Sequence, residues 1–376
     1  MDGIYLDNAA TTAPRPEAVR AFIDACAEYG NPSSLHRAGI VAKEALEKAR
    51  EKVSSAIGCK SEELIFTSGG SESNNQAIFA AAKLRGRRAK RIIVSEGEHP
   101  SVVNAAAQLA ESGFEVVGVP TRGGRLDIDF LAEALKTPTA LVCVMLANNE
   151  TGAVYDIAAV RSAITRAKSE AIFHCDAVQG FLKTPEHTLI KKFCDSASYS
   201  AHKVGGVKGV GALYIKSGFR SAPYIFGGGQ ERGLRSGTEN LPGISAFAAA
   251  CEAFDKAEYE RFDELNRFTA EKLGASCADI RLHLPERRGG AILSVSVPGV
   301  RSEVMLNALS AEGIYVSAGS ACSAARKGTS RVLEAYGLPR EELESALRIS
   351  FSHDNTKEEC AFAAERIAAN ALKLRK

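Results

Sequence analysis

The sequence lacks the patterns that mark secreted, disulfide-rich and membrane proteins. Its nine cysteines are odd in number, scattered along 376 residues and without a C-x-x-C pair, which argues against a disulfide framework and a structural zinc site. No apolar run approaches the roughly 18 residues that a membrane helix needs. The first residues, 1–16, do not form a basic stretch followed by an apolar one, so we expect no signal peptide. These absences predict a cytoplasmic protein that holds no metal.

An excess of charge of one sign is also lacking. The 47 Lys and Arg residues nearly balance 45 Asp and Glu residues, giving a net charge of +2. Composition therefore gives no reason to expect binding to nucleic acid or to a membrane. One local exception is the basic run KLRGRRAKR at 83–91. We interpret it as a solvated helix end and loop, with a docking surface for a partner, including one that carries RNA, as the alternative.

Short apolar runs alternate with segments of helical period from about residue 15 to 250. Several runs are apolar throughout rather than alternating, which is typical of a parallel sheet covered on both faces. With helical segments between them, they predict an α/β fold whose sheet is largely parallel. The strand candidates are 64–67, 91–95, 114–119, 140–147, 171–177 and 211–216.

The rhythm changes in the last third of the chain. A glycine-rich stretch at 226–243 is followed by a long helical segment at about 244–274. Two strand patterns, two helical patterns and a glycine/serine loop then indicate a smaller α/β domain. We expect a large domain at 15–255 and a small domain formed by 1–14 and 256–376.

Two motifs carry groups that could bind a phosphorylated, ring-containing ligand. FTSGGSESNN at 66–75 places Gly70 and Ser71 at a helix start, where free backbone N–H groups favour a phosphate. It lacks the Gly-Lys-Ser/Thr of a nucleotide loop, and an ordinary helix cap is the alternative. HCDAVQG at 174–180 ends a strand with Asp176, which could pair with a protonated ring nitrogen or simply cap the next helix.

Two further motifs carry nucleophiles. SYSAHKVGG at 198–206 places Lys203 beside His202, between a strand and a glycine-rich turn. A lysine held in a site has a lowered pKa and a neutral amine that attacks carbonyl carbon, whereas most lysines are solvated surface charges. SAGSACSAARKGTS at 317–330 places Cys322 among small residues near basic ones, which favours a reactive thiolate over the inert thiol expected of Cys143 in its apolar run.

Two single residues complete the candidates. His99 follows a strand end, where its ring could stack on a flat cofactor or lie solvated beside a helix start. Arg348 is placed in the apolar strand pattern ALRISFS. Its guanidinium suits a substrate carboxylate, and a structural ion pair is the alternative.

Taken in order along the chain, these motifs resemble those of the cysteine desulfurases in the class V aminotransferase group. The resemblance begins with YLDNAATT at 5–12, continues through NNETG at 148–152 and GGGQERGLRSGT at 227–238, and ends at LRISFS. The cysteine loop is similar to that of the iron–sulfur-cluster and nitrogen-fixation subgroup. The resemblance implies fold type I of the enzymes that use pyridoxal 5'-phosphate, with a large domain, a mostly parallel sheet and a smaller α/β domain.

The resemblance also implies how the cofactor is held. Lys203 matches the lysine that binds it covalently, Asp176 the acid at the pyridine nitrogen, and His99 the imidazole stacked on the ring. Asn149 and Gln179 match residues on the side of the ring oxygen. The residues matched to the phosphate are Gly70, Ser71, Ser200, His202 and, from the other subunit of a homodimer, Thr238.

The implied reaction converts L-cysteine to alanine and leaves a persulfide on Cys322 for transfer to a sulfur-acceptor protein. Arg348 and Asn149 match substrate-binding residues, and His99 is expected to move a proton. The acceptor would serve iron–sulfur clusters or the thiolation of tRNA or cofactors. Alternatives are a selenocysteine lyase, another class V aminotransferase, a non-catalytic sulfur-carrier partner and, more distantly, a nucleotide-binding protein.

Overall fold

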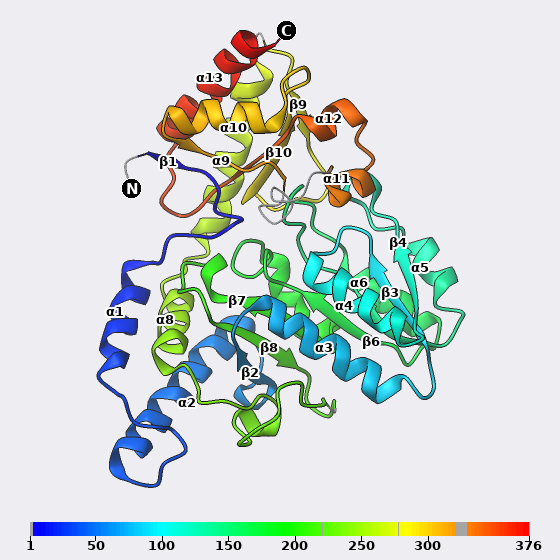
Figure 1. Cartoon of the computed structure of the whole chain (residues 1–376), viewed down its shortest axis with the longest axis vertical. Helices are drawn as coiled ribbons and strands as arrows, with labels where there is room; N and C mark the ends of the chain where they lie inside the picture. Colours follow the sequence, from blue (N-terminus) through cyan, green and yellow to red (C-terminus); the bar gives the residue numbers. More distant parts are fainter. Residues whose placement is uncertain (1–2, 220, 277, 320–328, 376) are drawn as a thin grey trace.

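The computed structural model describes residues 3–219, 221–276, 278–319 and 329–375. A seven-stranded sheet in the order β2-β8-β7-β6-β5-β3-β4 forms the centre of the larger, lower part (Figure 1). β8 is antiparallel to both of its neighbours, and the other neighbouring pairs are parallel. The prediction of a largely parallel sheet is therefore confirmed. The strands are β2 (Leu64–Thr67), β3 (Arg91–Ser95), β4 (Glu115–Val119), β5 (Thr139–Cys143), β6 (Ile172–Asp176), β7 (Ser196–Ser200) and β8 (Gly211–Ile215).

Helices cover this sheet on both faces, which explains the continuous apolar runs in its strands. One hydrophobic cluster joins the sheet to α2, α5, α6 and α8, and another joins β3 and β5 to α3 and α4. The helices of this part are α1 (Pro16–Cys26), α2 (Arg37–Ile57), α3 (Gly70–Arg85), α4 (Pro100–Glu111), α5 (Ile128–Ala134), α6 (Ile157–Arg166), α7 (Ile190–Phe193) and α8 (Leu241–Glu252).

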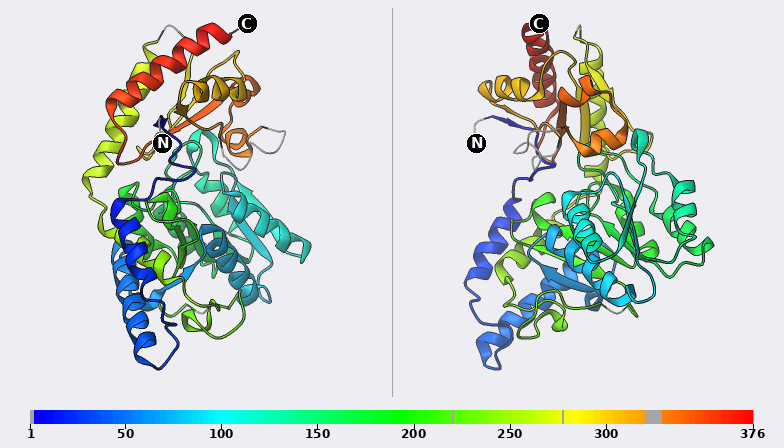
Figure 2. Two further views of the ribbon diagram at one scale, coloured as in Figure 1. Left: turned by 60° about the vertical axis from the view of Figure 1, so that its left-hand side comes forward. Right: turned by 45° about the vertical axis from the view of Figure 1, so that its right-hand side comes forward.

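The smaller, upper part contains a three-stranded antiparallel sheet in the order β12-β10-β9 and a parallel pair of β1 with β11. The helices α9 and α13 pack against each other along one side of it (Figure 2). Leu6 belongs to the hydrophobic cluster of this part, so the N-terminal segment joins the C-terminal third. The elements are β1 (Ile4–Tyr5), α9 (Ala257–Gly274), β9 (Arg281–His283), β10 (Ile292–Ser296), α10 (Ser302–Ala311), β11 (Ile314–Tyr315), α11 (Arg331–Tyr336), α12 (Arg340–Glu344), β12 (Ala346–Ser350) and α13 (Lys357–Leu374).

These separate clusters support a division of the chain into two domains. We propose the boundaries expected from the sequence, with 15–255 in the large domain and 1–14 and 256–376 in the small one. In the described part of the chain, no helix combines the length and the apolar character that crossing a membrane demands.

Two expected elements differ in extent from the structure. The strand expected at 140–147 is β5, which ends at Cys143. The long helix at about 244–274 is two helices, α8 and α9, separated by residues 253–256. Asp255 accounts for the break, because its side chain accepts a hydrogen bond from Ala257 N at 2.9 Å while its own N–H donates to Glu258 at 3.1 Å. Such local bonds satisfy the free N–H groups of a new helix start.

Candidate active site

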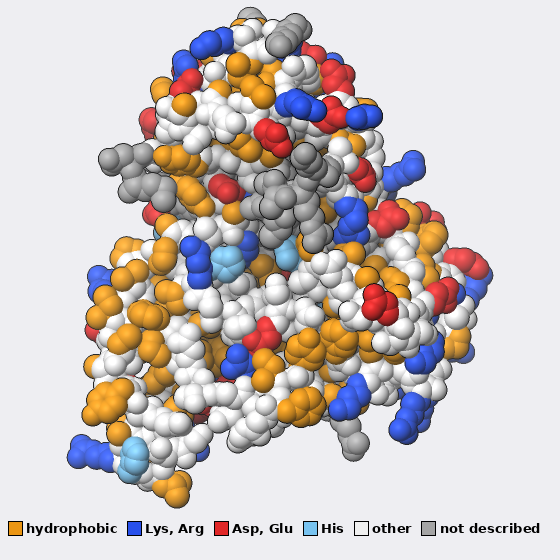
Figure 3. Space-filling model, viewed as in Figure 1, with side chains coloured by type: hydrophobic (Ala, Val, Ile, Leu, Met, Phe, Trp, Pro, Cys, Tyr) orange, Lys and Arg blue, Asp and Glu red, His pale blue; other side chains and the backbone are white. Residues whose placement is uncertain are grey.

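Four predicted site residues lie at one edge of the sheet, where the parallel strands end. His99 follows β3, Asn149 follows β5, Asp176 ends β6 and Lys203 follows β7. The carboxyl ends of parallel strands meet at the same edge, which is where open α/β sheets bind their ligands. Figure 3 shows histidine and basic side chains at the same level, at the waist between the two parts.

A cavity of about 270 Å³ brings these residues together with others that the sequence predicted. The N-terminal end of α3 contributes one wall, and β12 contributes Arg348 from the small part. Of the twelve predicted site residues, ten line the cavity: Gly70, Ser71, His99, Asn149, Asp176, Gln179, Ser200, His202, Lys203 and Arg348.

The other two predicted residues are placed differently. Thr238 is exposed to solvent and does not line this cavity. Cys322 lies outside the described residues. Cys143 is buried, and burial raises the pKa of its thiol. Cys143 is therefore a core residue, as its apolar run predicted.

The amine of Lys203 is held at the N-terminal segment of the chain. Its Nζ donates hydrogen bonds to the carbonyl oxygens of Ala9 and Ala10, both at 2.7 Å. Gln179 Nε2 donates to the same Ala9 oxygen at 2.8 Å. The YLDNAATT motif therefore supplies two backbone acceptors that orient the lysine, a role that the sequence did not indicate because backbone oxygens carry no residue signature.

The carboxylate of Asp176 is buried and fixed by two donors. Asn74 Nδ2 donates to Oδ2 at 2.7 Å, and Val178 N donates to Oδ1 at 3.0 Å. Asp176 thus caps the following turn and also lines the cavity, so the two alternatives for this residue are compatible.

His174 supports this arrangement from beneath the cavity. Its Nε2 is 2.9 Å from Asn74 Oδ1, and its Nδ1 is 2.9 Å from Ser196 Oγ. Because Asn74 uses its amide N–H groups on Asp176 and Ser101, its oxygen accepts, so His174 carries its proton on Nε2. Burial lowers the pKa of His174 to about 3 and keeps the ring neutral. The sequence places His174 two residues before Asp176, on the same strand face, but it does not reveal the bond through Asn74.

Replacement of His174 tests this neutral state through stability. Below about pH 6.5 the unfolded chain protonates the imidazole, whereas folded His174 stays neutral until about pH 3. The folded state therefore loses stability as the pH falls through this window, by about 2 kcal/mol at pH 5 for one such group. Urea unfolding at pH 7 and pH 5 should show His174→Gln losing about 2 kcal/mol less than the parent. Equal losses in the two proteins would contradict the buried neutral imidazole.

His99 caps the N-terminus of α4 and also lines the cavity. Its Nδ1 accepts from Ser101 N at 3.1 Å and lies 2.8 Å from Ser101 Oγ, so the neutral ring carries its proton on Nε2. Burial lowers its pKa. Burial likewise lowers the pKa of His202 to about 4, helped by the charge of Lys203. Both rings are therefore neutral near pH 7 and can donate or accept a hydrogen bond without adding positive charge.

Arg348 is almost fully buried on β12 and already engaged on two sides. Its Nη2 pairs with Asp7 Oδ1 at 2.7 Å, and its Nη1 donates to Asn149 O at 2.9 Å. Within the described residues, its Nε and the side-chain oxygen Asn149 Oδ1 have no hydrogen-bond partner. The ion pair that the sequence left as an alternative is present, and these two bonds use two of the five N–H groups of the guanidinium.

A buried lysine, Lys183, lies close to the cavity without lining it, and the sequence did not single it out. Lys183 Nζ donates to Gln179 Oε1 at 3.3 Å, which turns the Gln179 amide nitrogen towards Ala9. Burial, with the charges of Lys203 and Arg348, lowers the pKa of Lys183 to about 7. Lys183 therefore orients a cavity residue while adding less positive charge than an ordinary lysine.

The basic run at 83–91 lies away from this site. It covers the end of α3, the following turn and the first residue of β3, and most of its basic side chains are exposed. Arg85 pairs with Glu170 at 2.7 Å and Arg91 with Glu115 at 2.9 Å. The interpretation as a helix end and loop is confirmed.

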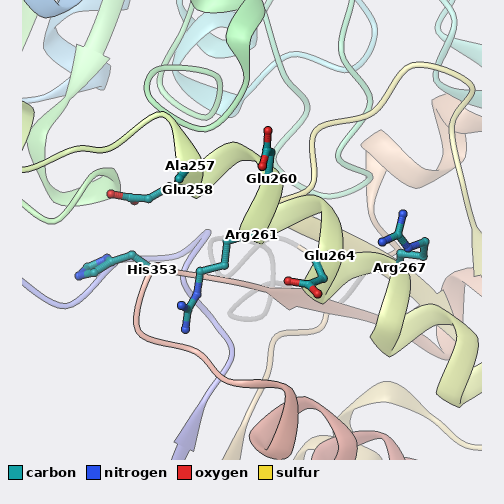
Figure 4. A pocket seen from close by; sticks show the side chains of 7 residues that line it. All are labelled: Ala257, Glu258, Glu260, Arg261, Glu264, Arg267 and His353. Carbon is teal, nitrogen blue, oxygen red and sulfur yellow. The ribbon is translucent and has the colours of Figure 1, made fainter.

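A larger hollow of about 620 Å³ lies along α9 and reaches His353. The side chains labelled in Figure 4 do not converge on one point. Several are already engaged, with Glu258 bonded to Arg15 and Glu264 to Lys357. Among the described residues, no lysine or cysteine with a reactive amine or thiol lines this hollow, so the smaller cavity is the candidate active site.

Comparison with known proteins agrees with this location. The model of the family described as aminotransferase class-V matches residues 4–361. The cysteine desulfurase IscS of Dictyoglomus turgidum is 39% identical over 379 residues, covering 99% of this chain and 95% of the relative. A solved structure of a NifS-like protein aligns with a TM-score of 0.91 at 36% identity, covering 99% of this chain and 100% of that one. The structure of SspA in complex with cysteine aligns with a TM-score of 0.80 at 30% identity, covering 92% and 98%. The chain therefore belongs to the class V aminotransferase family, among the members named cysteine desulfurases.

Proposed function

We propose that this protein is a cysteine desulfurase that uses pyridoxal 5'-phosphate to convert L-cysteine to L-alanine, with Cys322 accepting the sulfur. The observation that carries the proposal is one cavity that combines the amine of Lys203, the carboxylate of Asp176 and the start of α3. Full-length relatives named cysteine desulfurases, and a structural neighbour in complex with cysteine, support this substrate.

The cavity residues fit this cofactor in three places. At the start of α3, a Cβ on Gly70 would come within 2.6 Å of Val178 Cγ2, so the backbone there stays open only to glycine. Gly70 and Ser71 supply N–H groups for the phosphate, aided by the hydroxyl of Ser200. Asp176 suits a protonated ring nitrogen, and the side-chain oxygen of Asn149 has no hydrogen-bond partner in the described residues.

Bound pyridoxal phosphate supplies an aldehyde for the amino group of cysteine and a ring that withdraws electrons from its Cα. The cavity residues supply binding and proton transfer. Asp176 would hold a proton at the ring nitrogen, and Arg348 would bind the substrate carboxylate through guanidinium N–H groups that are not used on Asp7 and Asn149. The freed amine of Lys203 takes the proton from Cα, and the neutral ring of His99 moves a proton at the substrate.

Sulfur transfer requires a nucleophile, which we assign to Cys322. Its thiolate attacks the substrate Sγ, a sulfur–sulfur bond forms, and the substrate Cβ–Sγ bond breaks. The electron pair stays with the carbon framework, which takes up a proton at Cβ and leaves as alanine. The persulfide sulfur then passes to a thiol of an acceptor protein for iron–sulfur clusters or for tRNA or cofactor thiolation.

Product analysis separates this function from the alternatives. The cofactor-loaded protein, given L-cysteine and a thiol reductant, should release alanine and sulfide in equal amounts. An aminotransferase would instead need a keto-acid acceptor and would leave the sulfur on the carbon framework. A sulfur-carrier protein without catalysis would release neither product, and either result would overturn the proposal.

We also propose that the protein acts as a homodimer in the cytoplasm. Large exposed apolar side chains gather at the left of Figure 3, over α1 and α2, and include Ile23, Tyr29, Leu35 and Ile40. An exposed patch of this kind is typical of an interface. Exposed Thr238 would reach the phosphate of the partner, and all seven described cysteines are free, as in a reducing compartment. An active monomer in light scattering would contradict the dimer.

A further inference from the structure

The two ends of the segment that carries Cys322 meet at one buried carboxylate. Ser330 Oγ donates to Glu150 Oε2 at 2.5 Å. A Cβ placed on Gly319 would lie 2.9 Å from the same oxygen and 3.8 Å from Ser330 Cβ. Gly319 and Ser330 therefore lie next to each other, with the Glu150 carboxylate in contact with both. Gly319 has a φ of 61°, a conformation that favours glycine. The lack of a side chain also leaves room for the Glu150 carboxylate.

Glu150 is itself part of a rigid turn at the cavity. Asn148 Oδ1 accepts from the N–H groups of Glu150 and Thr151 at 2.9 and 2.8 Å, and Asn148 Nδ2 donates to Gly97 O at 3.0 Å. The neighbouring residue Asn149 lines the cavity. The turn thus places Asn149 at the cavity and Glu150 at the two loop ends. The hydrogen bonds of the turn fix the position of these two residues relative to each other.

Two residues near these loop ends, Ser317 and Arg331, also form hydrogen bonds at or beside cavity residues. Ser317 exchanges backbone hydrogen bonds with Arg348, at 2.7 and 3.1 Å. On the other side, Arg331 Nη2 donates at 2.8 Å to the carbonyl oxygen of Glu98, the residue before His99. These contacts use backbone carbonyl oxygens as acceptors. The bond from Ser330 to Glu150 joins two side chains, so a substitution can remove it without altering a cavity residue.

We propose that Glu150 is a positioning residue for sulfur transfer, which holds both ends of the segment between Gly319 and Ser330 against the turn that bears Asn149. The inference rests on the proposed function. Glu150 would affect the step in which Cys322 attacks the substrate sulfur, and no earlier step. Misplacing a reacting group by about 1 Å lowers the rate on the order of a hundredfold. A contact that fixes the two ends of the segment therefore has a large effect on this attack alone.

Single-turnover measurements on the cofactor-loaded full chain test the proposal. Glu150→Ala should keep the absorbance of the bound cofactor and its change on adding L-cysteine, because both depend on cavity residues. Persulfide formation on Cys322, measured by mass spectrometry, should slow by roughly tenfold or more. Glu150→Gln keeps an oxygen acceptor for Ser330 and should restore most of the rate. Ser330→Ala should slow the same step, and the Glu150→Ala/Ser330→Ala pair should be no slower than Glu150→Ala alone.

Glu63→Gln is a matched control, since Glu63 is also buried and accepts bonds from Lys60 N and Ser217 N outside the cavity. It should leave persulfide formation unchanged. Parental rates in both Glu150→Ala and Ser330→Ala would overturn the proposal, as would an equal loss of the cysteine-induced absorbance change. If the parent protein itself forms no persulfide with bound cofactor, the proposed function fails instead, which distinguishes the two failures.

Discussion

Lys203→Ala is expected to abolish the visible absorbance of the lysine-bound cofactor and to reduce alanine formation from cysteine on the order of a thousandfold or more. The amine of Lys203 lines the same cavity as Asp176 and the start of α3. Among the described residues, the other lysine close to the cavity is Lys183, whose amine donates to Gln179 and does not line the cavity. The loss should therefore appear both in the spectrum and in turnover.

Lys208→Ala is the matched control for this experiment. Lys208 is exposed in the following glycine-rich turn and does not line the cavity. Its replacement should leave the spectrum and the rate of alanine formation as in the parent. A Lys203→Ala protein that kept a lysine-bound spectrum after dialysis and sodium borohydride reduction would place the covalent bond on another residue and contradict the assignment.

Cys322→Ala should separate the two halves of the reaction. The variant keeps Lys203, Asp176 and Arg348, so cofactor absorbance and its change on adding cysteine should persist. Sulfide and persulfide should fall by about a hundredfold or more, because no thiolate is available to accept the substrate sulfur. Methylene blue detection of sulfide after addition of excess reductant measures the effect.

Cys26→Ala controls for the general loss of a thiol, since Cys26 is the exposed free cysteine of the described residues. It should release sulfide at the parental rate. If Cys322→Ala also released sulfide undiminished, the persulfide would form elsewhere or not at all. In the second case, the chain would act by direct elimination of sulfide from cysteine, as a lyase.

The apolar strands of the sheet could be predicted from sequence because burial on both faces leaves a clear signal. The expected ranges 64–67 and 91–95 match β2 and β3. β7 was not in the list of apolar strand candidates, because its sequence SASYS alternates serine with other residues, and only the motif around Lys203 indicated a strand there. It is nevertheless fully buried, and hydroxyl groups such as that of Ser196 are satisfied by His174. A polar strand of this kind becomes recognisable only when its hydrogen-bond partners are known.

The candidate site was predictable where it depends on residue type and chain order, and unpredictable where it depends on contacts. Motif order identified Asp176 and Lys203, and the fold brings both to one cavity. The support of Asp176 by His174 through Asn74 joins residues about 100 positions apart, which no local pattern reveals. The backbone oxygens of Ala9 and Ala10 that hold Lys203 also have no side-chain signature.

Several residues combine a structural role with a place in the cavity. His99 begins α4 and Arg348 pairs with Asp7, yet both line the cavity. The structural and functional alternatives weighed from the sequence therefore did not exclude each other for these residues. Hydrogen bonds to the fold fix the orientation of these side chains at the cavity.

The most direct test of the account follows one turnover with limiting L-cysteine and no reductant. The cofactor-loaded protein is quenched, digested and analysed by mass spectrometry for the position of the added sulfur, while alanine is measured in the same sample. We predict one added sulfur atom on the peptide that contains Cys322 for each alanine released. Alanine released without sulfur on that peptide, or sulfur on any other cysteine, would contradict the assignment of Cys322 as the sulfur acceptor.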